Sequence, residues 1–167
     1  VMTAGNLATT QIVISLLDER TKAPMDSNPS IMTASSIFQI AQMIGQTLRD
    51  VIQESVASGQ EATSAFDATI ILGGQIEPSE PRLFLIYPEG NFIEASEDTP
   101  YFQSGETKYG RPILVRAFDP DISFEDAIKL LMVSFDSTIK ANLSVGLPLD
   151  VQVYEKDSFT SGHNRRI

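Results

Sequence analysis

Hydrophobic residues in the first third of the chain recur at intervals of three and four, the spacing of an amphipathic helix. Asn6 can cap a helix, and the apolar positions after it predict one as far as about residue 20. A loop over residues 22–30, which contains two prolines, separates it from a second predicted helix over residues 35–57 that Ser58–Gly59 would close. Two consecutive helices of this kind predict one helical layer.

The hydrophobic period then shortens to that of strands. Residues 68–74 and 83–87 are short apolar runs, rich in β-branched and aromatic side chains, and they predict strands buried on both faces. A tight turn at 88–91 leads into a further strand at 92–95, which predicts a hairpin. Residues 1–5 resemble the end of a buried strand that turns into a loop.

The last third returns to helical spacing. Ser123 stands three residues before Asp126, a variant of the capping box, and a one-sided apolar stripe extends this predicted helix to about Ala141. The other predicted pieces are a compact loop at 103–106, a short helical or turn-rich segment up to 118, a loop at 142–148, a strand at 149–154 and a polar tail at 157–167.

Helices in pairs with antiparallel strands between them do not fit alternating βαβ crossovers. They predict an α+β fold, a four-layer αββα sandwich in a single domain over residues 1–167. The strands visible in the sequence barely supply a second sheet. We therefore expect the first strands to precede Val1, so that the chain is a fragment of a longer subunit.

Charge and composition restrict the partners. With 22 acidic and 12 basic residues the formal net charge is −10, which disfavours binding to nucleic acid or to an anionic membrane surface. The absence of cysteine excludes thiol chemistry and fits a reducing compartment, so we expect a cytoplasmic protein. His163 is the only histidine and lies in the polar tail, and we expect no metal and no cofactor. The acidic cluster of Glu94, Glu97 and Asp98 is interpreted as a solvated loop.

Three local sequences carry a family resemblance. They are TAGNLATTQ at residues 3–11, YPEG at 87–90 followed by QSGETKYG at 103–110, and LPLDV at 147–151. In this order and spacing they resemble the proteasome β-subunit family of the N-terminal-nucleophile hydrolases, and most closely its bacterial Anbu group. The resemblance implies a threonine-type peptidase subunit in a ring or helical homo-oligomer, acting on a peptide or small amide. It does not identify an unfoldase partner.

In that family the nucleophile is the hydroxyl of an N-terminal threonine, and the α-amine of the same residue is the general base. That threonine would lie upstream of Val1, so we expect this chain alone to be inactive. Gly5 matches the family glycine whose N–H donates to the oxyanion, where glycine lets the substrate backbone come close. Ser104, followed by Gly105, matches the serine that orients the terminal amine.

Asn142 and Ser144 fall where related subunits place an aspartate and a serine near the amine, and no carboxylate stands at that position. Thr3 and Leu7 would flank the pocket for the residue before the cleaved bond.

Simpler interpretations stay open at this point. Gly5 can be a turn glycine, Ser104 a loop hydroxyl, and Asn142 with Ser144 a helix stop. A non-catalytic structural or binding subunit of the same fold is the alternative function.

Overall fold

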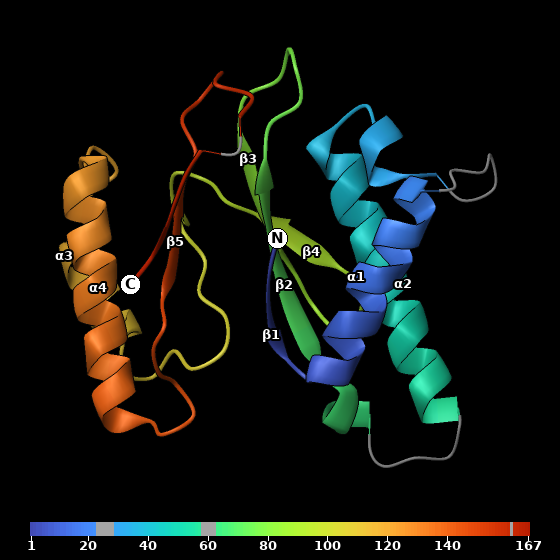
Figure 1. The fold of residues 1–167 in the computed structure, drawn as a ribbon, viewed down its shortest axis with the longest axis horizontal. Helices are drawn as coiled ribbons and strands as arrows, with labels where there is room; N and C mark the ends of the chain where they lie inside the picture. The colour runs from blue at the N-terminus through green and yellow to red at the C-terminus, as the bar shows by residue number, and fades with distance from the viewer. Residues whose placement is uncertain (23–28, 58–62, 161) are drawn as a thin grey trace. The chain divides into compact units, whose positions relative to one another are not determined.

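The computed structural model describes residues 1–22, 29–57, 63–160 and 162–167 (Figure 1). The chain divides into two compact units, residues 1–104 and 105–167, and each is described by itself. Each unit combines two helices with an antiparallel sheet, so the predicted α+β class is confirmed. No helix among the described residues is long and apolar enough to cross a membrane.

The first unit is a four-stranded antiparallel sheet with a pair of helices on one face (Figure 1). The strands follow one another across the sheet in chain order, so each pairs with the next. They are β1 (Met2–Gly5), β2 (Ala68–Gly74), β3 (Arg82–Ile86) and β4 (Phe92–Glu94). The helices are α1 (Leu7–Lys22) and α2 (Ile37–Ala57), with short 3-10 helices η1 (Ile31–Thr33) and η2 (Thr63–Phe66).

Both helices of this unit begin where the sequence predicts. The Asn6 side chain accepts the N–H of Thr9 at 2.9 Å, and the Ser36 hydroxyl accepts that of Gln39 at 3.2 Å. Such side-chain caps satisfy N–H groups that have no partner within the helix. The predicted loop at 22–30 lies largely outside the described residues, as does the predicted stop at Ser58–Gly59.

The core of the first unit lies between the helix pair and the sheet. Alternate residues of β2 point toward the helices, as the period of two in a strand requires. The buried cluster contains Val13, Leu17, Ile37, Ala41, Ile44, Leu48, Val51, Ile52, Ala68, Ile70, Leu72, Phe84 and Ile86.

The prediction that residues 1–5 end a buried strand is half wrong. These residues do form β1, but Met2 is 63% exposed and Thr3 is also exposed. Among the described residues β1 is the outermost strand of the sheet, so its side chains have a neighbouring strand to pack against on one side only.

The β3–β4 hairpin carries an ion pair. Arg82 donates to both carboxylate oxygens of Glu94, at 2.5 and 2.6 Å, and its guanidinium lies 4.9 Å from the ring centroid of Phe84. The hydrogen bond from Arg82 is the main reason that the pKa of Glu94 lies below its usual value, and partial burial opposes this shift. The interpretation of Glu94 as a solvated loop acid is therefore wrong, because this residue ends a strand and is paired across the hairpin.

We expect Glu94→Gln to lower the free energy of unfolding by about 0.5 kcal/mol at pH 7, because solvent screens a pair this exposed. A carboxyl group whose pKa is lowered by folding stabilises the folded state at pH values above its ordinary pKa. This stabilisation is lost as the pH falls through the lowered pKa. The unfolding free energies of the two proteins, measured by urea titration at several pH values, should therefore become equal at acidic pH. A constant difference at every pH would contradict this assignment.

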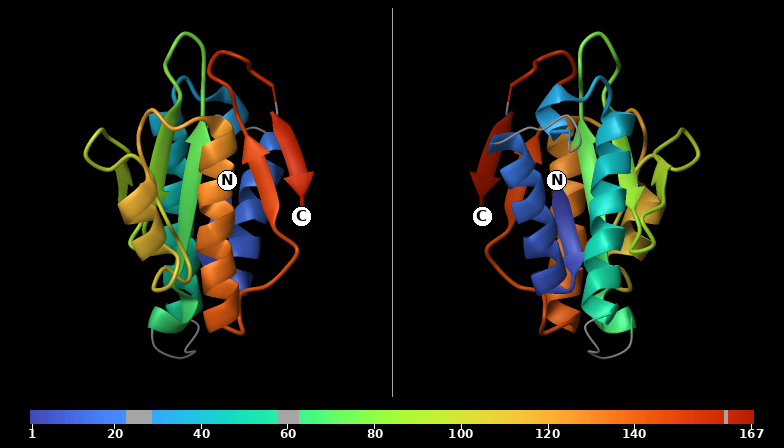
Figure 2. Two further views of the ribbon diagram at one scale, coloured as in Figure 1. Left: turned by 90° about the vertical axis from the view of Figure 1, so that its left-hand side faces the viewer. Right: turned by 90° about the vertical axis from the view of Figure 1, so that its right-hand side faces the viewer.

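The second unit consists of a helix pair and a two-stranded sheet (Figure 2). Its elements are α3 (Arg111–Ala117), α4 (Phe124–Ala141), β5 (Asp150–Val153) and β6 (His163–Arg166). The predicted tail at 157–167 is polar, but four of its residues form β6, antiparallel to β5. Arg166 holds Asp150 through two hydrogen bonds at 2.7 and 2.8 Å.

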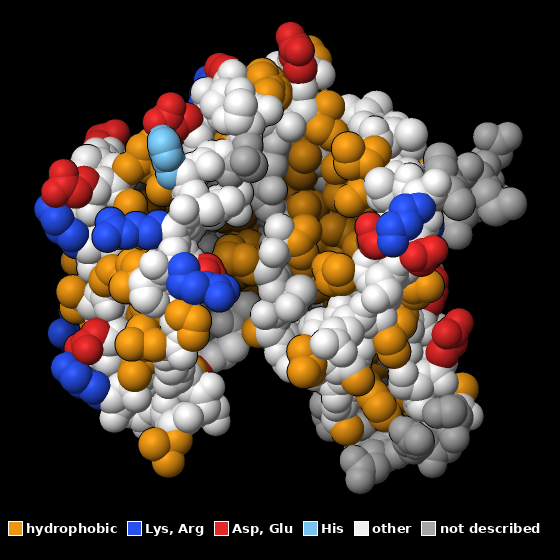
Figure 3. Space-filling view, viewed as in Figure 1, with side chains coloured by type: hydrophobic (Ala, Val, Ile, Leu, Met, Phe, Trp, Pro, Cys, Tyr) orange, Lys and Arg blue, Asp and Glu red, His pale blue; other side chains and the backbone are white. Residues whose placement is uncertain are grey.

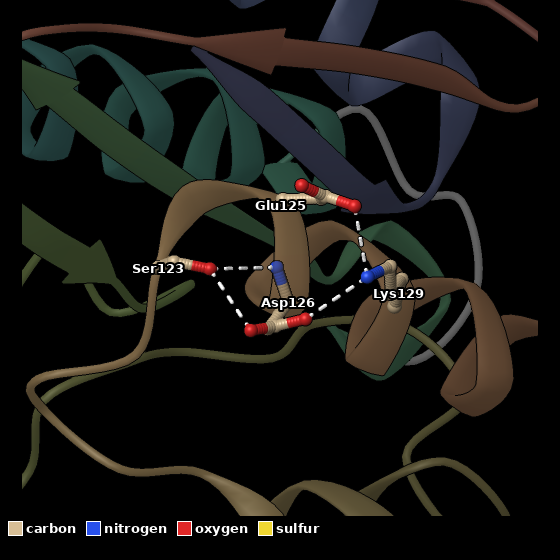
Figure 4. Close-up of polar contacts among 4 residues, drawn as sticks. All are labelled: Ser123, Glu125, Asp126 and Lys129. Atoms are coloured by element: carbon tan, nitrogen blue, oxygen red, sulfur yellow. Dashed lines mark hydrogen bonds and ion pairs between the residues drawn. The ribbon is translucent and has the colours of Figure 1, made fainter.

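The start of α4 has the predicted cap (Figure 4). The Ser123 hydroxyl accepts the N–H of Asp126 at 3.2 Å and donates to its carboxylate at 3.0 Å. Lys129 bridges Glu125 at 2.9 Å and Asp126 at 3.1 Å on the exposed side of the first turns. The side chains that fix this helix end are therefore all local in sequence.

The buried residues of α4 are polar, which the sequence pattern does not predict. They are Ser134 and Thr138, and a Cβ added to Gly110 would lie 2.4 Å from the Ser134 hydroxyl. The segment before α3 thus approaches α4 at a position where only glycine fits. Apolar residues of the predicted stripe stay partly exposed, such as Leu131 and Phe135, and hydrophobic side chains lie among charged ones on this surface (Figure 3).

Candidate functional site

Gly5 ends β1 and has a φ of +110°, a backbone conformation that side chains other than hydrogen disfavour. A Cβ at this position would lie 2.4 Å from the carbonyl oxygen of Asp67 and 2.8 Å from the Cα of Ala68. The family resemblance implies glycine here because a substrate backbone would approach closely. The structure shows a further reason for glycine, because the atoms that exclude a side chain here belong to the chain itself.

The register of β1 and β2 fixes the direction of the Gly5 peptide group. Gly5 lies opposite Ala68. The next residues along the two strands, Asn6 and Asp67, form a hydrogen-bonded pair, because the N–H of Asn6 donates to the carbonyl of Asp67 at 2.9 Å. Hydrogen-bonded and non-hydrogen-bonded pairs alternate in an antiparallel ladder, so Gly5 belongs to a non-hydrogen-bonded pair. Its N–H therefore points away from β2, toward the side of β1 on which no described strand lies.

Asn6 holds this strand-to-helix turn in place. Besides capping α1 it donates from its side-chain amide to the carbonyl of Ala65 at 2.8 Å. Thr3 and Leu7, the predicted pocket residues, lie on either side of the turn, and both side chains are exposed, Leu7 by 69%. They are available to a ligand that reaches Gly5.

Ser104 is half-buried, and its hydroxyl is hydrogen-bonded to that of Thr69 in the middle of the sheet. Thr69 lies opposite Ala4, the neighbour of Gly5, so the structure brings Ser104 to the same end of β1 and β2 as Gly5. Sequence reasoning missed Thr69. Its one signal is a hydroxyl side chain within an otherwise apolar run.

In the second unit Asn142 does more than end α4. Its backbone N–H closes the helix by donating to Thr138, while its side-chain oxygen accepts the N–H of Ser144 at 2.8 Å. Its side-chain NH₂ donates at 2.8 Å to Glu106. The simpler interpretation, a helix stop, accounts for only the first of these contacts.

Glu106 is a second residue that sequence reasoning missed. Its other carboxylate oxygen accepts the backbone N–H of Lys108 at 2.7 Å. This bond, and after it the bond from Asn142, lower the pKa of Glu106, so it is ionised at neutral pH. The Asn142 loop therefore has a carboxylate beside it, although none occurs in the loop sequence.

The predicted residues fall into two sets. Thr3, Gly5, Leu7 and Ser104 belong to the first unit, and Gly105, Asn142 and Ser144 to the second. In the first unit a cavity of about 520 Å³ opens between α1, α2 and the β3–β4 turn, but none of the predicted residues lines it. The described residues contain no cluster of acidic and histidine side chains that could hold a metal ion.

Chemically, the first set offers a backbone N–H donor and a positioned hydroxyl at the same end of β1 and β2. The second set offers an ionised carboxylate that fixes an amide. These groups can stabilise a developing negative charge and orient a polar partner. Each set by itself therefore suits binding and stabilisation of a reacting group rather than nucleophilic attack.

Comparison with known proteins gives a consistent set of relatives. No protein-family model and no curated protein matches the chain. Among solved structures it is similar to Anbu (ancestral beta-subunit) from Yersinia bercovieri, with 45% identity and a TM-score of 0.91. It is similar to Anbu from Hyphomicrobium sp. strain MC1, with 44% identity and a TM-score of 0.87. It is also similar to the helical assembly of the Anbu complex from Pseudomonas aeruginosa, with 41% identity and a TM-score of 0.90. In all three the match covers 99% of this chain and 67% of the relative.

Proposed function

Because this chain belongs to the Anbu family of proteasome-like β subunits, we propose that it is the body of a threonine-type peptidase subunit. The nucleophile would be an N-terminal threonine on a segment that precedes Val1. The substrate class is a peptide or a small amide. The residues of this chain would bind and stabilise rather than attack.

The observation that carries this proposal is the direction of the Gly5 N–H. It points away from β2 at the end of β1, and Asn6 fixes the turn on its far side. A donor held in place before the reaction stabilises a transition-state charge without reorganisation, and one such donor contributes about 3–4 kcal/mol.

The reaction then runs in two halves. The threonine hydroxyl adds to the scissile carbonyl carbon while the α-amine takes the proton of that hydroxyl. The resulting oxyanion accepts a hydrogen bond from the Gly5 N–H. When the C–N bond breaks, the α-amine returns the proton to the leaving amine, and an ester remains on the threonine. Water hydrolyses that ester by the same route. Ser104, held by Thr69, would orient the α-amine.

We propose that the subunit works in a self-assembled homo-oligomer in the cytoplasm. The relative from Pseudomonas aeruginosa is described as a helical assembly of the Anbu complex, which supports a homo-oligomer for this chain. The absence of cysteine supports a reducing compartment.

A non-catalytic subunit is the second candidate, favoured by asparagine at position 142 in place of a carboxylate. The hydrogen bond between Asn142 and Glu106 weakens that objection, because a carboxylate adjoins the loop after all. Catalysis is therefore the function that we prefer.

The test is covalent labelling of the full-length subunit with a β-lactone, which transfers its acyl group to an N-terminal threonine. Intact mass should rise by the mass of one lactone per subunit, and replacement of the N-terminal threonine by alanine should abolish the change. We expect Ser104→Ala to slow labelling roughly tenfold or more, since an orienting hydrogen bond is lost. Ser15→Ala, on the exposed side of α1, is the matched control and should label normally. If the wild-type subunit is never labelled, the proposed threonine-type peptidase activity is excluded.

A further inference from the structure

Asn142 and Glu106 lie 36 residues apart in sequence, yet their side chains meet in the second unit. Neither residue is fully buried, so burial alone does not force the contact. The pair connects two segments that both carry predicted site residues. Glu106 directly follows Ser104–Gly105, and Asn142 begins the loop that contains Ser144.

The hydrogen bonds around Asn142 allow only one orientation of its amide. Its oxygen accepts from the N–H of Ser144, and its nitrogen donates to the Glu106 carboxylate. If the amide were rotated by half a turn, its NH₂ would face the N–H of Ser144 and its oxygen would face a carboxylate. Both of those contacts are repulsive, so the charge on Glu106 determines where the two ends of the amide point.

Glu106 is itself held from the other side. The backbone N–H of Lys108 binds one carboxylate oxygen at 2.7 Å and leaves the other for Asn142. A bond between an ionised acceptor and a neutral donor is stronger than one between two neutral groups. These groups therefore form a continuous row of hydrogen bonds, which we call the polar relay. It begins at the N–H of Lys108, passes through Glu106 and Asn142, and ends at the N–H of Ser144. The orientation of each side chain in the row depends on its neighbour.

We infer that Glu106 is a positioning residue of the candidate site. It acts through Asn142 to fix the loop that carries Ser144, and it provides the carboxylate that this loop lacks. This inference rests on the proposed function for its consequence in catalysis, but the relay itself stands on the contacts alone.

Exchanging the carboxylate at position 106 and the amide at position 142 tests this inference. In Glu106→Gln only one acceptor oxygen remains where Glu106 has two. The introduced amide can therefore keep the bond from Lys108 or the bond from Asn142, but it keeps both only if Asn142 turns and releases Ser144. In Asn142→Asp two carboxylates face each other and repel. The double variant restores every link with donor and acceptor reversed, because the amide introduced at position 106 can donate to the carboxylate introduced at position 142. That carboxylate can still accept the N–H of Ser144.

Two measurements on the full-length subunit separate the possible results. The first is hydrogen exchange of the Ser144 and Lys108 backbone amides. We expect at least one of them to exchange roughly tenfold or more faster in each single variant, and both to exchange near the wild-type rate in the double variant. The second is the rate of β-lactone labelling at saturating probe, with the same expected pattern. Asp136→Asn is the matched control, because it removes an exposed carboxylate that pairs with Lys140 on α4, and it should change neither rate.

The outcomes for the relay and for the enzyme are distinguishable. If the wild type is not labelled, the proposed function fails, while exchange at Ser144 still tests the relay. If exchange responds to the variants but labelling does not, Glu106 is a structural residue only and the positioning role is overturned. If neither single variant changes exchange at Ser144 or at Lys108, the relay is wrong.

Discussion

Replacement of Gly5 by alanine should destabilise the subunit by about 3 kcal/mol or more, the largest effect that we expect from one added methyl group. Two costs combine. The φ of +110° is strained for any residue with a Cβ, and the new Cβ would lie 2.4 Å from the Asp67 carbonyl oxygen. Neither can relax cheaply, because the obstacle is backbone and Asn6 bonds to the same segment at Ala65.

Equilibrium unfolding of the full-length subunit in urea measures this effect. Gly146→Ala is the matched control, since a Cβ there would meet nothing within 4 Å, and we expect a change of less than about 0.5 kcal/mol. If Gly5→Ala proved as harmless as the control, the tight turn described here would be incorrect. Alanine keeps the backbone N–H, so loss of labelling in a variant that still folded would show that the position of this turn matters for the reaction.

The second large effect is expected at Gly45, where two arguments oppose each other. Glycine in a helix interior is less favourable than alanine by about 1 kcal/mol, so helix propensity alone predicts that Gly45→Ala stabilises α2. However, a Cβ at this position would lie 2.3 Å from the carbonyl oxygen of Gly90, in the turn between β3 and β4. Helix and turn meet backbone to backbone, so one of them must move.

We expect the clash to prevail, with a net loss of about 2–3 kcal/mol. Gly73→Ala offers a graded comparison. Its Cβ would meet only the flexible Leu83 side chain, at 3.3 Å, and should cost less than about 1 kcal/mol. Urea titrations of the two variants rank them directly, and a Gly45→Ala protein more stable than wild type would show that the helix and the turn are not in contact.

Elements with a strong local pattern could be predicted from the sequence. The apolar stripe of α2, the β-branched run of β2 and the caps at Asn6 and Ser123 all depend on neighbours within a few residues. β6 could not be predicted in this way. Its four residues are all polar, and it is held by backbone pairing with β5 and by the contact of Arg166 with Asp150.

The same distinction applies to the candidate site. The family resemblance predicts Gly5 and Ser104 as site residues, and the structure adds contacts that no local pattern contains. Thr69 lies 35 residues from Ser104 in sequence, and Glu106 lies 36 residues from Asn142. Contacts between residues so far apart produce no periodic pattern in the sequence. A hydroxyl in a strand or a glutamate after a glycine has many possible partners, so the sequence alone does not predict which one it contacts.

The pairing of β1 with β2 also has a consequence for the timing of synthesis. Residues 2–5 pair with residues 68–71, and Asn6 bonds to Ala65 and Asp67. On a ribosome the Gly5 turn therefore has no partner until residues 65–71 have been made and have left the exit tunnel. A contact that closes so long a loop forms late in folding. Until then an emerging chain would lack the proposed oxyanion donor, and with it the means to cleave its neighbours.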